Sequence, residues 1–277
     1  MDKSLVNRWA LALFLLSSFL LTPGLAEAGP WTKSTGEYYL KIGESFYRAT
    51  SFRTGSGIQI SGVDYFSATT YLYGEAGVWE NLHIQTYIPL MYSRTAIGGT
   101  DQSDFGFGDA KLGLQASPFP TPFPTSIRLE GQIPLYGPPA TPQTPARGDQ
   151  QLDLTLWVSA GGGLSVLPLY FYADLGYMHR TDITFDDTVV PDFSDSFVAL
   201  AQVGYTIADT LIVALNTSAI LPFQEDSVTE SYITVGPSIF WPITDRIALE
   251  MDGSFTPYSR NSAEGWALGF GISFRQD

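Results

Sequence analysis

The sequence predicts an all-β protein that folds as a closed antiparallel transmembrane β-barrel of about twelve strands, with short periplasmic turns and longer extracellular loops. Three observations lead to this prediction. Only 15% of the 277 residues are charged while 14% are aromatic, whereas a soluble domain carries about 25% charged residues. Apolar residues alternate with small or polar ones at a period of two. Short and long connections also follow each other along the chain.

Composition and charge exclude several classes of protein. The formal net charge of −14 makes nucleic acid a poor partner, because a polyanion is repelled by an acidic surface. The absence of cysteine excludes thiol catalysis, cysteine zinc sites and a lipid-modified N-terminal cysteine. The sequence has no phosphate-binding loop and no histidine or carboxylate cluster with zinc spacing. We therefore expect neither a cofactor nor a metal centre.

The first element, residues 1–28, has the pattern of a secretory signal peptide that is removed. Lys3 and Arg8 form a basic start, Trp9 to Leu21 an apolar core, and Ala26-Glu27-Ala28 a cleavage site. The alternative, an N-terminal membrane anchor, fits less well because the apolar run is short. We expect residues 29–277 to form the barrel in the cell outer membrane, since closure satisfies every backbone group in lipid without a membrane helix.

The alternation that predicts strands is clearest in Ser126–Tyr136, Gln151–Ser159 and Trp266–Phe274, where one face is large and apolar and the other is small or polar. A strand between lipid and a crowded lumen needs these two faces. The same pattern predicts twelve strands in order: Glu37–Arg48, Phe66–Val78, Leu82–Arg94, Phe105–Ala116, Thr125–Tyr136, Gln151–Gly162, Leu169–Thr181, Ser196–Ile207, Leu211–Pro222, Tyr232–Trp241, Arg246–Pro257 and Gly265–Phe274.

The connections alternate as barrel topology requires, with short turns at Trp79-Glu80-Asn81, Ala208-Asp209-Thr210 and Thr244-Asp245. Twelve strands place both termini on the periplasmic side. The longer polar loops are expected at Ala49–Tyr65, Thr95–Asp104, Gly137–Gln150, Asp182–Asp195, Gln224–Ser231 and Ser259–Glu264.

Proline marks the irregular places in this pattern. Pro118–Pro124 is a proline-rich turn, longer than the other short connections. Pro89, Pro134 and Pro237 lie inside predicted strands, where a residue without an N–H group disrupts the ladder. We expect local bends or bulges at these positions.

One run resembles a known family. Phe105–Gln115 contains Gly106, Gly108, Asp109 and Gly113 in the G-x-G-D-x-x-x-G spacing of an outer-membrane family named after the MetA pathway of phenol degradation. The resemblance covers most of the mature chain. It implies an outer-membrane barrel that acts as a transporter, and it supplies no catalytic residue. Further similar segments are Gly36–Lys41, Trp79–Leu82, Thr244–Glu250 and Gly265–Ile272.

The chain is also similar in outline to hydrophobic-solute channels of the FadL type. Only about eight residues, Gly29–Gly36, precede the first predicted strand. These are too few for the N-terminal hatch of such channels, so we expect no N-terminal plug in the lumen.

Charged residues in the inward phase of the strands are the candidates for a solute path. They can act as a selectivity filter or pair with each other as a structural network. Asp109 and Lys111 are expected to pair across strands with Arg128 and Glu130. The candidate lumen residues are Lys41, Glu75, Asp109, Lys111, Arg128, Glu130, Asp153, Asp174, Arg246, Glu250 and Asp252.

Two other groups of residues have competing interpretations. Acidic loop residues suit divalent cations or bridges to lipopolysaccharide, although simple solvation of the loops accounts for them better. These acids are Asp182, Asp186, Asp187, Asp192, Asp195, Glu225, Asp226 and Glu230. Aromatic residues near strand ends fit interface girdles better than a ligand cage. These aromatics are Trp31, Tyr38, Tyr65, Trp79, Tyr92, Tyr170, Trp241 and Trp266.

Catalysis would most plausibly recruit His83 or His179, but neither lies in a nucleophile motif. The sequence therefore predicts a channel or transporter rather than an enzyme. Small solutes, hydrophobic or aromatic ones among them, would pass through a narrow polar lumen. The alternative is a structural or adhesive barrel with a blocked lumen and cation-binding acidic loops. The expected partners are the solute, outer-membrane lipid, lipopolysaccharide and the barrel-assembly machinery.

Overall fold

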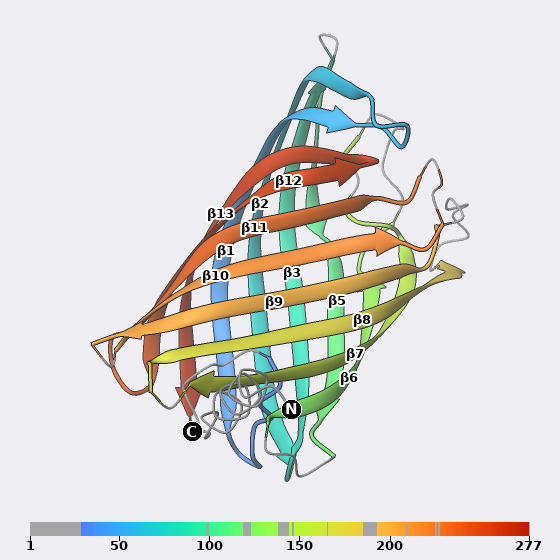
Figure 1. Ribbon diagram of the computed structural model, residues 1–277. Helices are drawn as coiled ribbons and strands as arrows, with labels where there is room; N and C mark the ends of the chain where they lie inside the picture. Colours follow the sequence, from blue (N-terminus) through green and yellow to red (C-terminus); the bar gives the residue numbers. More distant parts are fainter. Residues whose placement is uncertain are drawn as a thin grey trace, which may run out of the picture.

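The computed structural model forms one closed β-barrel (Figure 1). It describes residues 29–97, 100–118, 123–137, 144–145, 147–164, 166–184, 193–208, 210–224, 226 and 228–276. No helix among them has the length and apolar character to cross a membrane. The strands are β1 (Tyr38–Arg53), β2 (Gln59–Trp79), β3 (Leu82–Ile97), β4 (Thr100–Phe107), β5 (Asp109–Ala116), β6 (Thr125–Pro134), β7 (Gln151–Leu164), β8 (Leu169–Thr184), β9 (Ser196–Ile207), β10 (Leu211–Pro222), β11 (Ser231–Pro242), β12 (Ile247–Arg260) and β13 (Ser262–Gln276).

Every strand pairs antiparallel with its neighbours, and β1 closes the barrel by pairing with both β2 and β13. The strands β4 and β5 both pair with β3, on its outer and inner halves, and so form one interrupted crossing. The thirteen described strands therefore make twelve crossings, as predicted. The interruption lies at Gly108, whose N–H donates to the carbonyl of Pro89 at 3.1 Å.

Gaps in the strand pairing lie at two of the three prolines for which bends or bulges are expected. Pro89 lies opposite the interruption of the fourth crossing. Pro237 interrupts the ladder between β11 and β12, whose paired positions skip from Val235 to Ser238. Pro134 instead ends β6. Residues 119–122 of the proline-rich turn lie outside the described residues.

The strand positions agree with the predicted ranges at the short-turn end and differ at the other. Bacterial barrels place short turns in the periplasm, so we call this the periplasmic end and the opposite one the extracellular end. Three expected extracellular loops, Ala49–Tyr65, Thr95–Asp104 and Ser259–Glu264, are mostly strand instead. Polar partners on neighbouring strands, such as Arg53 on β1 and Glu264 on β13, 2.7 Å apart, continue the ladder beyond the apolar band.

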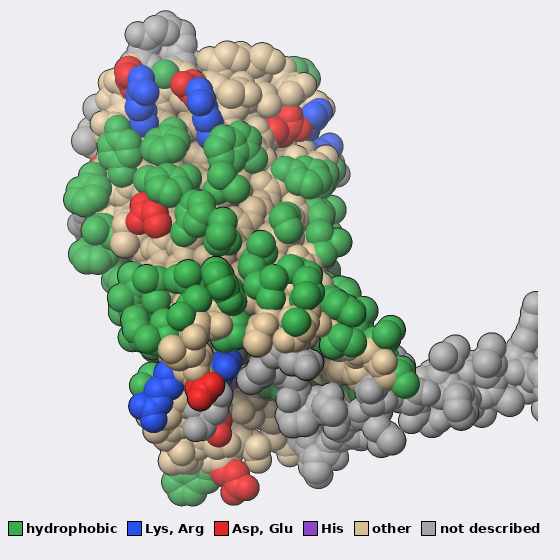
Figure 2. All heavy atoms as spheres, turned by 90° about the vertical axis from the view of Figure 1, so that its left-hand side faces the viewer, with side chains coloured by type: hydrophobic (Ala, Val, Ile, Leu, Met, Phe, Trp, Pro, Cys, Tyr) green, Lys and Arg blue, Asp and Glu red, His purple; other side chains and the backbone are tan. Residues whose placement is uncertain are grey.

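The outer surface carries a broad apolar band (Figure 2). Ile42, Leu129 and Phe270 are among the outward side chains, with exposed fractions of 52%, 55% and 43%. Exterior ion pairs such as Arg94 with Asp101 lie beyond this band, toward the extracellular end. An apolar exterior around a closed ladder is the architecture of an outer-membrane protein.

The aromatic girdle is only partly as predicted. Tyr38, Trp79, Tyr92, Trp241 and Trp266 are exposed large side chains of the barrel. The prediction was wrong for three other aromatics: Trp31, Tyr65 and Tyr170. Tyr65 and Tyr170 occupy inward positions of their strands, and Trp31 lies before β1 against Tyr172. The side of the sheet to which a side chain points follows from the alternation along the strand, not from its distance to the strand end.

Several inward glycines lie beneath a large side chain of the neighbouring strand. A Cβ atom on Gly43 would lie 2.3 Å from the ring of its partner Tyr71, and one on Gly204 would lie 2.2 Å from the ring of its partner Tyr170. Gly269 lies beneath the carboxylate of its partner Asp252 in the same way. Small inward residues therefore make room for large side chains to lie flat along the lumen wall.

Candidate functional site: the barrel lumen

The lumen contains two cavities, and both are lined by Leu200 and Ser218. The inner cavity has a volume of about 570 Å³ and lies between β1–β3 and β8–β12. The outer cavity has a volume of about 360 Å³ and is bounded largely by β5–β10 and the loop before β7. Cavities of a few hundred cubic ångströms are large enough for small organic molecules.

Tyrosine dominates one wall of the inner cavity. The rings of Tyr71 and Tyr87 lie 5.5 Å apart and tilted, and those of Tyr39 and Tyr73 lie 6.0 Å apart edge to face. These contacts fix flat aromatic surfaces along β1–β3. The six tyrosines that line the cavity are Tyr39, Tyr71, Tyr73, Tyr87, Tyr170 and Tyr172.

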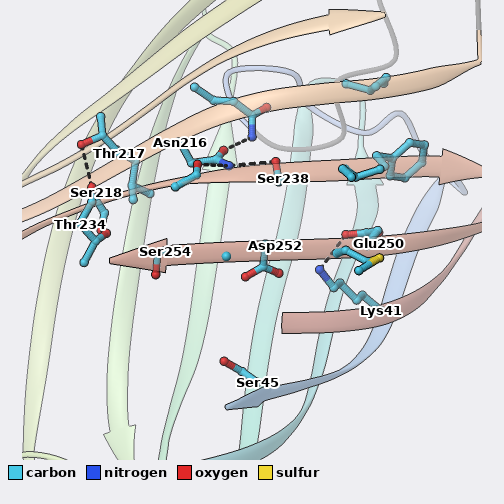
Figure 3. Close-up of a pocket in the computed structure, with 18 of the residues that line it drawn as sticks. Lys41, Ser45, Asn216, Thr217, Ser218, Thr234, Ser238, Glu250, Asp252 and Ser254 are labelled. Carbon is cyan, nitrogen blue, oxygen red and sulfur yellow. Dashed lines mark hydrogen bonds and ion pairs between the residues drawn. The ribbon is translucent and has the colours of Figure 1, made fainter. Parts of the chain in front are cut away.

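Amide and hydroxyl groups form a hydrogen-bonded row across β8–β11 on another wall. The Tyr170 hydroxyl donates to Gln202 at 2.6 Å, and the Gln202 amide donates in turn to Asn216. Asn216 donates to Ser238 Oγ at 2.8 Å (Figure 3). Because these groups satisfy each other, the row gives the wall a fixed polar surface.

The charged groups of the inner cavity lie on β1 and β12. Lys41 Nζ lies 2.7 Å from Glu250 Oε2, and the Tyr39 hydroxyl donates to the other carboxylate oxygen. Asp252 lies nearby with its carboxylate in the cavity (Figure 3). No hydrogen bond or ion pair connects Asp252 to another residue in the described part of the chain.

Arg128 is the central charge of the outer cavity. Its guanidinium lies 5.0 Å from the ring centroid of Trp157 and 3.7 Å from a carboxylate oxygen of Asp174. Glu130 lies 3.7 Å from Arg128 and 3.7 Å from Lys111. Met178 and Val198 pack against Trp157, and with Ile220 they give the same cavity an apolar wall. The outer cavity therefore combines charged and apolar walls.

The loop before β7 folds into the extracellular end of the lumen. The N–H of Asp149 donates to Asp109 Oδ2 at 3.3 Å, and a Cβ on Gly148 would lie 2.0 Å from the same oxygen. Arg180, on β8, is hydrogen-bonded to Asp149 and lies 3.6 Å from Asp153. The described part of this loop thus narrows the outer cavity.

The segment before β1 enters the periplasmic end of the barrel, although it is short. We call Gly29–Glu37 the N-terminal segment. Its Lys33 N–H donates to His83 Nδ1 at 3.1 Å, and its Gly29 carbonyl accepts from Gln115 Nε2 at 2.9 Å. The chain enters the barrel because both partners are buried inward groups, and sequence length alone did not reveal this.

Ten of the eleven candidate lumen residues lie on the inward face. Arg246 does not: it is exposed in the turn before β12, because the strand begins at Ile247. The expected cross-strand pairing holds for Lys111 with Glu130. Asp109 instead accepts a hydrogen bond from Gln132 at 3.0 Å.

Sequence reasoning missed Arg180 and Asp149 among the charged groups of the outer cavity, and it placed Glu230, which lines the same cavity, in an extracellular loop. Arg180 shares the inward phase of Asp174 on β8, so the alternation could have identified it. Asp149 lies in a loop, where no periodic signal exists. Its place in the lumen depends on the infolding of that loop.

The extracellular acids are partly described. Asp226 accepts hydrogen bonds from the N–H of Val228 at 2.8 Å and from Thr229. Partial burial works to raise its pKa, but these hydrogen bonds outweigh burial and lower it. No three metal-ligating side chains converge in the described residues. Asp186, Asp187, Asp192 and Glu225 lie outside the described residues.

The two histidines have different surroundings. His83 is fully buried in the lumen, with its second ring nitrogen 2.7 Å from Gln85 Nε2. His179 is outward, as expected, and lies 3.0 Å from Asp195 on the exterior. Among the described residues, neither histidine is hydrogen-bonded to a serine or threonine hydroxyl.

The chain matches no protein-family model and no curated protein. Solved structures do match it. An outer membrane channel from Pseudomonas putida F1 aligns over 92% of this chain and 100% of its own, with a TM-score of 0.69 and 12% identity. The translocator domain of the autotransporter NalP from Neisseria meningitidis covers 98% of this chain and 96% of its own (TM-score 0.55, 10% identity).

A third match is the NanC porin, which aligns over 86% of this chain and 100% of its own, with a TM-score of 0.52 and 11% identity. At these identities the likeness concerns the fold. A channel, a porin and an autotransporter translocator share it, so the fold alone does not select one activity. The chain has the closed, all-β antiparallel barrel fold of outer-membrane proteins.

Proposed function

We propose that this protein is an outer-membrane channel through which small solutes pass. The observation that carries the proposal is the pair of polar-lined cavities inside the closed barrel, which both border Leu200 and Ser218. A structural barrel needs no such space, because side chains can fill a narrow lumen completely. The likeness to an outer membrane channel and to a porin supports the proposal.

The solutes are small and include hydrophobic or aromatic molecules. The tyrosine wall of the inner cavity and the apolar wall around Met178 in the outer cavity support this class. Membership in the outer-membrane family named after the MetA pathway of phenol degradation would fit it. That membership remains a prediction from the short motif at Gly106–Gly113.

Selectivity is assigned to the inward charges. Arg128 projects between Asp174 and Glu130 in the outer cavity, so a passing solute meets both signs of charge there. Fixed charges of this kind set the ion preference of a pore. Asp109, beside the infolded loop, is placed to affect cation passage most directly.

Single-channel recording in a planar bilayer tests the proposal, with the refolded mature chain and a salt gradient. We expect discrete current steps whose reversal potential shifts toward anions in Asp109→Asn. Glu44→Gln is the matched control, because Glu44 bonds to Thr70 on the outer face of the wall. A folded barrel that never conducts would refute the channel.

One observation favours the alternative of a structural or adhesive barrel. The N-terminal segment fills the periplasmic end and the loop around Gly148 narrows the extracellular end. If both stay in place, the lumen is blocked. Removal of residues 29–36 separates the two readings: a gated channel conducts more after the deletion, whereas a permanently sealed barrel stays silent.

A further inference from the structure

The inner cavity contains one carboxylate that the protein leaves without a bonded partner. Each oxygen of Glu250 has a partner, because Lys41 bonds to one and the Tyr39 hydroxyl donates to the other. Asp252, two residues along β12, makes no hydrogen bond or ion pair within the described residues. Lys41 lines the same cavity but is bonded to Glu250. The charge of Asp252 therefore has no ion-pair partner of its own among the described residues.

The position of Asp252 exposes its charge to the cavity. Asp252 lies opposite Gly269 on β13, and its Oδ1 would be 2.5 Å from a Cβ at that glycine. The missing side chain lets the carboxylate lie against the wall with its oxygens facing the cavity (Figure 3). The hydroxyls of Ser45 and Ser254 line the same cavity. These groups are acceptors for a molecule that brings N–H donors.

Aromatic surface lines the same cavity as this carboxylate. Tyr71 is one of the lining residues, and Lys41 Nζ lies 5.8 Å from the centroid of its ring. The tyrosines and the apolar side chains of Leu200 and Ile212 form the remaining walls. Aromatic faces attract cations and also pack against flat rings.

These features discriminate between classes of solute. An anion would be repelled by the uncompensated charge of Asp252. A pure hydrocarbon would displace water from the carboxylate without replacing its hydrogen bonds, which is unfavourable. A bound metal ion needs several converging ligands, and the described residues contain no such group. A cation with N–H donors and an apolar body satisfies both the carboxylate and the aromatic wall.

We propose that the inner cavity is a binding station for small organic ammonium ions that carry a flat ring. The ammonium group bonds to Asp252 and the ring packs among the cavity tyrosines. The proposal deepens the channel function and rests on it, because the solute must reach the inner cavity. It assigns Asp252 a role in specificity rather than in the structural ion-pair network.

Isothermal titration of the refolded, detergent-solubilised mature protein tests this. The probe is 2-phenylethylammonium, with 2-phenylethanol and phenylacetate as the neutral and anionic analogues. We expect the ammonium ion to bind at least about tenfold more tightly than the alcohol, the usual effect of a charge-assisted hydrogen bond. Asp252→Asn removes this preference, Asp252→Glu retains it, and the outer-face control Glu44→Gln leaves it unchanged.

Equal affinity for the ammonium ion and the alcohol would overturn the proposal, as would unchanged ammonium binding in Asp252→Asn. The titration needs no passage across a membrane, so its result is independent of whether the barrel conducts. A barrel that conducts but shows no preference keeps the channel and loses the binding station. A barrel that binds the ammonium ion but never conducts keeps the station and loses the channel.

Discussion

Replacement of Gly77 by alanine is expected to expel the N-terminal segment from the periplasmic end. Gly77 faces inward on β2, and its N–H donates to the Glu37 carbonyl at 2.9 Å while its own carbonyl accepts from Gly36 at 3.3 Å. A Cβ atom there would lie 1.8 Å from the backbone oxygen of Ser34. Backbone cannot rotate away as the end of a side chain can, so the segment itself must move.

The cost follows from the contacts. Loss of the two backbone hydrogen bonds removes about 2 kcal/mol, at about 1 kcal/mol each. The overlap adds strain of about 1–3 kcal/mol if the segment stays. The shorter of the remaining polar anchors are the bonds of Lys33 to His83 and of Gly29 to Gln115, worth about 2 kcal/mol together by the same measure. A loss of about 2 kcal/mol or more lowers the equilibrium constant for docking of the segment by roughly 30-fold or more.

Two measurements report the outcome. Single-channel conductance is expected to increase in Gly77→Ala, and hydrogen exchange at the Lys33 N–H is expected to accelerate. Gly74→Ala on the same strand is the control, because its Cβ would meet its nearest neighbour, Thr86 Cγ2, at an ordinary 3.5 Å. Unchanged conductance together with unchanged protection of Lys33 in Gly77→Ala would refute the reasoning.

Two further predictions concern the wall and the extracellular end. Gly204→Ala displaces the Tyr170 ring, which lies 2.2 Å from the added Cβ. This should lower the free energy of unfolding in urea by about 1–2 kcal/mol. Gly131→Ala, on the outward face, should not lower it, and equal stabilities of the two variants would contradict the prediction. Burial, and then the charge of Asp149, raises the pKa of Glu230 to about 7 from 4.5. The folded state therefore holds this proton more tightly than the unfolded state does. The free energy of unfolding is expected to fall as pH rises from about 4.5 to 7 and then to level off. Thermal unfolding at several pH values should show a flatter dependence in Glu230→Gln, and an unchanged slope would contradict the prediction.

The sequence predicts the membrane-spanning part of the fold well because lipid imposes a strict period of two there. Ser196–Ile207 and Leu211–Pro222 begin and end where the alternation does. Beyond the apolar band both faces are polar, so the pattern disappears although the hairpin continues. The pattern therefore assigns the outer ends of β1 and β2 to a loop, whereas in the structure the ladder continues through them, with Arg48 and Asp64 3.3 Å apart.

The lumen was predictable to the same extent and for the same reason. Phase placed Lys41, Glu250 and Asp252 on the inward face, but it did not show that Lys41 bonds to Glu250 and not to Asp252. That choice depends on the side-chain geometry of two strands far apart in sequence. The infolding of the N-terminal segment and of the loop at Asp149 depends on such long-range contacts as well.

The side chains that cover inward glycines bear on how the barrel keeps its register. A slip by two residues preserves inside and outside for every strand, so the apolar band cannot oppose it. The glycine positions can. Tyr71 lies directly opposite Gly43, and a two-residue slip would set its ring against the side chain of Lys41 or Ser45. Each such pair therefore favours the native register over one shifted by two residues. Only the native register places every one of these large side chains over a glycine.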